Sequence, residues 1–187
     1  DGARWRAFDL PNRQTVRAVS IGPGDLVFCG GFAEFGYWKT DATGQRAYNS
    51  LSRQVSSKRL GKEEIWHIFQ GQGHVFFQSF SALYEYDFQS VTELSPPGAV
   101  MFGTEVGGQI WVPVIGKGLY ELRAGGTFQL VPGTEVLKDK IVQFLVPNGV
   151  GGVWAGTTNS GIFEVQGGQC RAWESPLNEV FKKHQLN

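Results

Sequence analysis

A pattern of aromatic and glycine residues that returns roughly every 40 residues constrains this sequence more than any other feature. Tyr37, Tyr84, Tyr120 and Phe163 occupy equivalent places in four copies of the pattern. Each copy contains short apolar runs separated by turns, which pair most simply as an antiparallel meander. A repeat of about 40 to 50 residues with four strands per unit is typical of a β-propeller. We therefore predict an all-β chain, a β-propeller fragment of about four four-stranded antiparallel blades.

The last copy shows the unit most clearly. Its apolar runs are Ile141–Leu145, Val153–Gly156 and Ile162–Val165, followed by a final run that ends at Trp173. Glycine-rich or polar turns separate these runs. A single blade of this kind cannot bury both of its faces, so each copy needs a neighbour on each side.

The repeat also predicts how the domain is divided. Residues 1–187 are expected to form one propeller-type domain with blades at 15–50, 64–94, 98–131 and 140–173. Within the third blade we expect the first strand at Ala99–Gly103. We expect residues 1–10 to be the outer strand of a preceding blade and residues 174–187 to begin a following one, so that the chain is part of a longer ring. Helical periodicity is nearly absent, with the tail after Ser175 as the one candidate.

Charge and hydropathy exclude several classes of function. Seventeen basic residues balance 17 acidic ones, so the electrostatic footprint needed for nucleic acid or an anionic membrane is missing. We expect no direct nucleic-acid binding by this chain.

No run reaches the roughly 18 apolar residues that cross a bilayer, and no signal-peptide pattern is present. A basic cluster in residues 51–62 is followed at once by Glu63 and Glu64 and is interpreted as a solvated loop.

The two cysteines, Cys29 and Cys170, lie in the first and last copies. A disulfide between them would close a ring of blades. Ordinary buried thiols are the favoured interpretation, because both occupy small apolar strand positions.

Catalytic and metal-binding patterns are weak. The three histidines are His67 in a strand pattern, His74 at a turn and His184 in the tail, and none is accompanied by a nucleophile-elbow motif. No histidines or cysteines have ligand-pair spacing and no acidic calcium loop is present, so we predict neither a metal nor another cofactor. The neighbouring acids Glu63 and Glu64 would point to opposite faces of a strand. We predict a protein that is not an enzyme.

The aromatic residues that recur at one blade position could stack on sugar rings, but their recurrence favours packing between blades. These residues are Trp66, Phe76, Trp111 and Trp154.

Turns between the second and third strands of successive blades should share one rim of a propeller. Their residues vary in type where the core repeats, which favours a binding surface over packing. The candidate ligand-binding residues on this rim are Glu34, Phe80, Lys117 and Asn159. Ordinary solvated turn residues are the alternative interpretation for each of them.

Several motifs resemble the propeller repeats in the sensor regions of large membrane-spanning regulators of gut Bacteroidetes. These regulators include hybrid two-component sensors and related proteins that end in a DNA-binding helix-turn-helix. The resemblance extends over about residues 15–173, and the motifs that define it are Phe35–Trp38, Glu64–Ile68, Val75–Phe80, Gly116–Leu122 and Val153–Thr157.

The resemblance implies a periplasmic propeller followed by a three-tyrosine immunoglobulin-like module, a transmembrane helix and a cytoplasmic output domain. Contact with a membrane would then be made only by segments outside this sequence. Glycan fragments or other nutrient cues are the ligands that the resemblance implies for signal transduction and transcription regulation.

Our leading hypothesis is a non-catalytic sensing or ligand-binding module. Two alternatives stay open: a propeller enzyme acting on polysaccharide, as a lyase or glycosidase, and a platform for protein–protein interaction. We also expect self-association through exposed blade faces, because uncovered apolar sheet surfaces of that size are uncommon in monomers.

Overall fold

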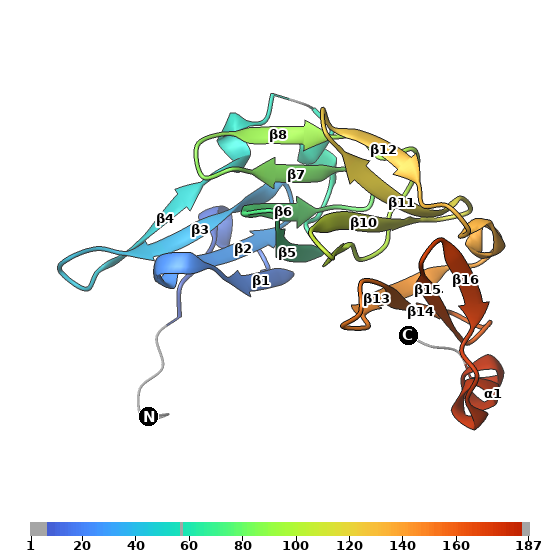
Figure 1. Ribbon diagram of the computed structural model, residues 1–187. Coiled ribbons are helices and arrows are strands. Elements are labelled where there is room, and N and C mark those ends of the chain that lie inside the picture. Colours follow the sequence, from blue (N-terminus) through green and yellow to red (C-terminus); the bar gives the residue numbers. More distant parts are fainter. Residues whose placement is uncertain (1–6, 57, 185–187) are drawn as a thin grey trace. The chain divides into compact units, whose positions relative to one another are not determined.

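The computed structural model describes residues 7–56 and 58–184, which form four four-stranded antiparallel sheets (Figure 1). In each sheet the strands are neighbours in chain order, so the all-β prediction is confirmed. The chain divides into two compact units, Asp1–Ile68 and Phe69–Asn187. The first sheet contains β1 (Ala18–Ile21), β2 (Val27–Gly31), β3 (Glu34–Thr40) and β4 (Arg46–Ser50); the second contains β5 (His67–Gly71), β6 (His74–Gln78), β7 (Leu83–Tyr86) and β8 (Val91–Leu94).

The other two sheets follow the same plan. The third contains β9 (Thr104–Val106), β10 (Gln109–Val114), β11 (Gly118–Arg123) and β12 (Thr127–Leu130); the fourth contains β13 (Val142–Pro147), β14 (Val153–Thr157), β15 (Ile162–Gln166) and β16 (Gln169–Ala172). Five short 3-10 helices lie in the connections: η1 (Pro11–Arg13), η2 (Pro23–Asp25), η3 (Ser52–Gln54), η4 (Leu60–Lys62) and η5 (Glu135–Leu137). The predicted loop at 51–62 therefore contains η3 and η4.

The four recurring aromatics lie at the same register of the third strand in every sheet. Each is directly opposite a buried residue of the second strand: Tyr37 opposite Phe28, Tyr84 opposite Phe77, Tyr120 opposite Val112, and Phe163 opposite Ala155. The sequence repeat is thus a structural repeat at the level of individual residues.

In the first unit, residues 63–65 run beside the end of β2. Ile65 N donates to Gly31 O at 3.0 Å, and Ala33 N donates to Glu63 O at 2.8 Å. A Cβ at Gly30 would lie 2.6 Å from the Ile65 side chain, so glycine is needed for this close approach. The approach buries Ile65 completely.

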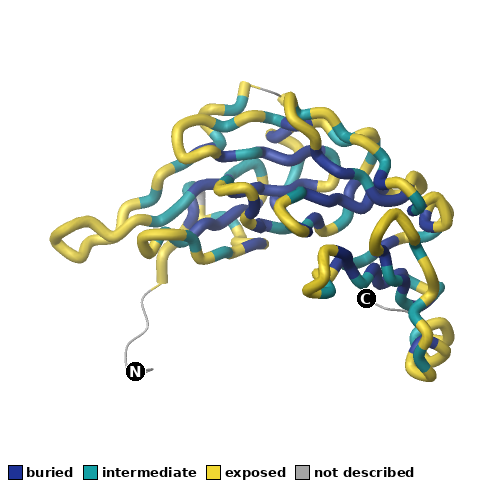
Figure 2. The backbone as a smooth tube through the Cα atoms, viewed as in Figure 1, coloured by how far each residue is buried: buried dark blue, intermediate teal, exposed yellow. Residues whose placement is uncertain are grey.

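The second unit has two hydrophobic cores, one on each side of the third sheet. Phe69, Phe76 and Leu83 of the second sheet pack with Ile110 and Val112 and their neighbours on one side. Figure 2 shows that burial is concentrated in the second and third strands of the sheets. On the other side, a separate core includes Val106, Trp111, Leu137, Val142, Val153 and Phe163. Burial of apolar surface in each core stabilises the fold by roughly 25 cal/mol per Å². A single sheet could not bury this surface without a neighbour.

The first strand of the third sheet begins later than the sequence predicts. Residues 99–101 meet β10 only through a bridge between Val100 and Val114 and two adjacent backbone hydrogen bonds, and β9 starts at Thr104. The break follows from Gln78, whose side-chain amide donates to Met101 O at 2.7 Å and accepts from Gly103 N at 2.9 Å. The amide thereby bonds two backbone groups at the break.

The N-terminal end also differs from expectation. Residues 1–6 of the predicted outer strand lie outside the described residues, and residues 7–10 form no strand. The segment after Trp173, which is also the one helical candidate of the sequence, forms helix α1 (Pro176–Lys183) over part of its described length, and its assignment to a following blade stays a prediction. Ser175 caps this helix by accepting from Leu177 N at 3.3 Å, and Pro176 occupies its first turn, a combination that favours helix initiation.

Candidate functional site

Of the four residues predicted on the rim, Glu34 is held in a cluster of hydroxyl groups in the first unit. Its carboxylate accepts hydrogen bonds from Tyr48 Oη at 3.0 Å, Ser50 Oγ at 2.8 Å and Ser52 Oγ at 2.9 Å. Burial, together with the nearby Glu34 charge, raises the pKa of Tyr48 above its usual range, so the phenol stays a neutral donor. The arrangement ties β3, β4 and η3 together, and three protein donors already occupy the carboxylate.

The other three predicted residues are in the second unit and are exposed. Phe80 is 43% exposed, and Lys117 Nζ donates to Pro97 O at 2.5 Å. Asn159 Oδ1 accepts from Ser160 Oγ at 3.5 Å. None of these three residues lines the pockets of the second unit described below.

A polar pocket of about 240 Å³ lies between the second and third sheets. Gln72 and Glu85 form one wall, and the end of β11 with the turn before β12 forms the other, through Leu122, Arg123, Ala124, Gly125 and Gly126. The pocket is formed by the turns before β6 and after β11. In an antiparallel meander these turns are at the strand ends opposite the turns between second and third strands, which form the predicted rim.

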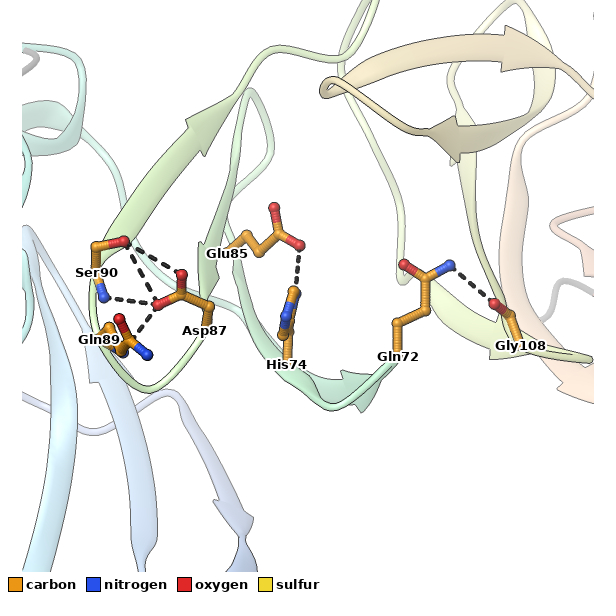
Figure 3. Close-up of polar contacts among 7 residues, drawn as sticks. All are labelled: Gln72, His74, Glu85, Asp87, Gln89, Ser90 and Gly108. Atoms are coloured by element: carbon orange, nitrogen blue, oxygen red, sulfur yellow. Dashed lines mark hydrogen bonds and ion pairs between the residues drawn. The ribbon is translucent and has the colours of Figure 1, made fainter.

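The wall on the second sheet is built around His74 and Glu85. His74 Nδ1 and Glu85 Oε1 are 2.7 Å apart, and both side chains are partly exposed (Figure 3). Glu85 is directly opposite Phe76, two residues after His74, so His74, Phe76 and Glu85 share one face of the sheet. Phe76 is fully buried in the core below. The His74–Glu85 pair is therefore on the same face of the sheet as the buried Phe76 ring.

The hydrogen bonds around this pair fix the neighbouring turns. Asp87 accepts from Gln89 N at 2.8 Å and Ser90 N at 2.7 Å, and these bonds hold the pKa of the Asp87 carboxyl below its usual value. Gln72 Nε2 donates to Gly108 O at 2.8 Å, which links the turn before β6 to the turn before β10 (Figure 3).

On the opposite wall, Arg123 is positioned by an acid. Its Nη2 is 2.7 Å from Glu121 Oε2, and Glu121 is only 5% exposed. The guanidinium is partly exposed and lies on the same face of the third sheet as Glu121 and Trp111, whereas the side chain of Leu122 faces the second sheet.

The pocket thus presents the Glu85 carboxylate and the Gln72 primary amide, and the His74 imidazole contacts that carboxylate from beside the pocket. A carboxylate and an amide can accept and donate to adjacent hydroxyl groups, which is the chemistry that polyhydroxylated ligands need. A histidine oriented by a carboxylate can also move a proton. The site can therefore bind a polar ligand, and it contains one pair suited to acid–base chemistry.

Sequence reasoning named His74 only as a turn residue and did not single out Glu85 or Arg123. One signal was present: a glutamate follows the aromatic landmark in three copies, as Glu85, Glu121 and Glu164. The structure places all three at the same register, opposite Phe76, Trp111 and Trp154.

Metal and membrane elements are not found in the described part of the chain. Residues 7–56 and 58–184 contain no group of three or more His, Cys, Asp or Glu side chains that could hold a metal ion. Among the same residues, no helix has both the length and the apolar character to cross a bilayer. Cys29 and Cys170 are free thiols.

Comparison with known proteins identifies the fold. No protein-family model matches the chain, and no curated protein matches it in sequence. Its structure is similar to a catalytically inactive virginiamycin B lyase from Staphylococcus aureus with quinupristin, in which a histidine is replaced by alanine (13% identity, TM-score 0.65, 90% of this chain and 59% of that one). It is also similar to YCF48 bound to D1 peptide (17% identity, TM-score 0.63, 97% and 60%).

A third similar structure is the extracellular domain of a hybrid two-component system from B. thetaiotaomicron (16% identity, TM-score 0.64, 92% of this chain and 24% of that one). The chain thus spans 59 to 60% of the lyase and YCF48 chains and about a quarter of the sensor domain. These likenesses establish a β-propeller fold of four blades, as predicted, and a sensor domain is among the proteins that share it.

Proposed function

We propose that this chain is a ligand-binding part of an extracytoplasmic sensor propeller, and that its ligand is a glycan fragment or a similar polyhydroxylated nutrient cue. The observation that supports this most is the pocket of about 240 Å³ between the second and third sheets, which Gln72 and Glu85 line on one side and where His74 contacts Glu85. The similarity to the extracellular domain of a two-component system supports the sensing role and the extracytoplasmic location.

The polar groups of the pocket suit hydroxyl recognition because each is already oriented. Glu85 is held by His74, and Gln72 by Gly108 O. Preorganised groups lose little conformational entropy when a ligand binds. A pocket of this size matches one sugar ring or a small disaccharide portion better than a long chain.

Calorimetry with a panel of neutral and acidic oligosaccharides tests the proposal, run beside an assay for newly released sugar ends. Binding without release of sugar ends supports a sensing module. Glu85→Gln should weaken that binding at least tenfold, because the amide cannot replace a charged acceptor, while the matched variant Glu135→Gln, at an exposed position away from the pocket, should bind as the native chain does. No binding across the panel, or equal loss in both variants, would contradict the proposal.

A second candidate function is a lyase-type enzyme, favoured by the 2.7 Å contact between His74 and Glu85 and by the similarity to a lyase whose inactive form lacks a histidine. In that function His74 would be the proton-transferring group and Glu85 would orient it. Release of sugar ends that is abolished by His74→Gln and retained in His184→Gln would favour the enzyme over the sensor.

A further inference from the structure

The fourth sheet has one face that no other sheet of the second unit covers, and we name it the Trp154 face after its central residue. It consists of Trp154, Glu164, Arg171 and Trp173, which line a hollow of about 330 Å³ together with Ala172 and Glu174. The two indole rings are in edge-to-face contact, with centroids 5.6 Å apart and an interplanar angle of 61°. Arg171 is directly opposite Glu164 on the neighbouring strand, so both charges are on this face.

The equivalent faces of the two preceding sheets are covered. Phe76, opposite Glu85, is fully buried against the third sheet, and Trp111, opposite Glu121, is 8% exposed against the fourth. Trp154 has the same register but is only half-buried. Twice within this chain, therefore, such a face is completed by another four-stranded sheet.

Among the side chains that the structure describes, Glu164 on the Trp154 face also lacks the side-chain partner that the equivalent glutamates of the two preceding sheets have. Glu85 contacts His74 and Glu121 contacts Arg123, each at 2.7 Å. Gln166 stands at the position equivalent to Arg123, and among the described residues the Glu164 carboxylate has no hydrogen-bond or ion-pair partner. Arg171 donates to Gln169 rather than to Glu164.

We propose that the Trp154 face docks on the same face of a second copy of this chain, around a two-fold axis. Under such an axis each Glu164 meets the Arg171 of the other copy, and the four indoles form one apolar centre. The face is self-complementary in charge, since it holds one acid and one base beside its aromatics. This gives Glu164 a side-chain partner, as Glu85 and Glu121 have within their own sheets.

The size of the sheet sets the strength of the association. Four strands of about five residues, spaced about 4.8 Å apart, give a flat area on the order of 300 Å² per copy, which is below the area of a standard specific interface. A weak dimer that forms only at high protein concentration is therefore expected.

Sedimentation velocity from 5 μM to 1 mM, with a charge-exchange pair, tests the proposal. Arg171→Glu and Glu164→Arg should each be monomeric over this range, because like charges then meet twice across the axis. An equimolar mixture of the two variants should recover the dimer, because opposite charges again face each other. Arg53→Glu, an exposed position in the first unit, should associate as the native chain does.

Three results would overturn the proposal: a native chain that stays monomeric at 1 mM, single variants that dimerise normally, or a mixture that stays monomeric although circular dichroism shows both variants folded. Monomers whose tryptophan fluorescence changes on adding an oligosaccharide, in native chain but not in Trp154→Ala, would assign the face to a sugar instead and would also overturn it.

Discussion

Asn178 and Ile162 hydrogen-bond as neighbouring strands do, although Asn178 belongs to a helix. Ile162 N donates to Asn178 Oδ1 at 2.6 Å, and Asn178 Nδ2 donates back to Ile162 O at 3.1 Å and to Trp173 O at 2.9 Å. Asn178 is only 2% exposed. One side-chain amide therefore attaches α1 to the fourth sheet and satisfies backbone groups at the start of β15.

Replacing Asn178 by alanine should lower the free energy of unfolding by about 2 to 3 kcal/mol, because Ile162 N would lose its acceptor and the Ile162 and Trp173 carbonyls would each lose one of two donors. Urea denaturation followed by circular dichroism measures the change. Asn159→Ala, at an exposed turn position, is the matched control and should change stability by less than about 0.5 kcal/mol. Equal stability of the two variants would show that the amide does not attach the helix.

Gln78 has a comparable role between the second and third sheets, where its amide pairs with Met101 O and Gly103 N and is 2% exposed. We expect Gln78→Ala to cost about 2 kcal/mol in unfolding free energy. Amide hydrogen exchange at Gly103 should also accelerate, because its donor loses its acceptor. Gln129→Ala on the exposed side of β12 is the control, and unchanged exchange at Gly103 in Gln78→Ala would refute this role.

The Asp87 turn should make stability depend on acid pH. Hydrogen bonds from the Ser90 and Gln89 backbone hold the pKa of Asp87 below its usual value, so its stabilising effect is present above the pKa of the unfolded chain and is lost as pH falls through the folded value. Asp87→Asn keeps an acceptor at every pH. Between pH 5 and pH 2 the variant should lose less unfolding free energy than the native chain. A parallel loss in both proteins would exclude this contribution.

The two thiols should be unreactive in the folded chain. Burial, followed by the Glu34 charge, raises the pKa of Cys29 to about 11, and burial raises the pKa of Cys170 to about 11. At pH 8 roughly one thiol in a thousand is then the reactive thiolate. A chromogenic disulfide reagent should label neither cysteine within minutes, but both at once in denaturant. Rapid labelling of Cys29 in the native state would contradict its burial.

Much of the fold could be predicted because each blade repeats local signals. The aromatic landmarks and glycine turns placed the second and third strands of every sheet, and these are the most buried strands. The late start of β9 could not be predicted, because it depends on the Gln78 amide, 25 residues before Gly103 in the chain. Helix α1 forms in the tail after Ser175, the one helical candidate of the sequence, but its attachment to β15 through Asn178 could not be predicted from a local pattern.

The site was harder to predict than the fold. The varied residue types of the turns between second and third strands predicted a binding surface at the strand ends that carry Phe80, Lys117 and Asn159. The polar pocket instead combines Glu85 of one sheet with Arg123 of the next, and their proximity depends on how two sheets pack. The recurrence of a glutamate after three of the four aromatic landmarks was the available signal, but it could not show which copy borders a pocket.

Amide NMR titration with the tightest-binding oligosaccharide of the panel shows where a polyhydroxylated ligand binds. If it binds in the pocket beside Glu85, shift changes should be concentrated at Gln72, Glu85, Gly125 and Gly126 and absent in Glu85→Gln. Changes confined to the turns at Phe80, Lys117 and Asn159, or equal changes in Glu85→Gln, would contradict binding in this pocket.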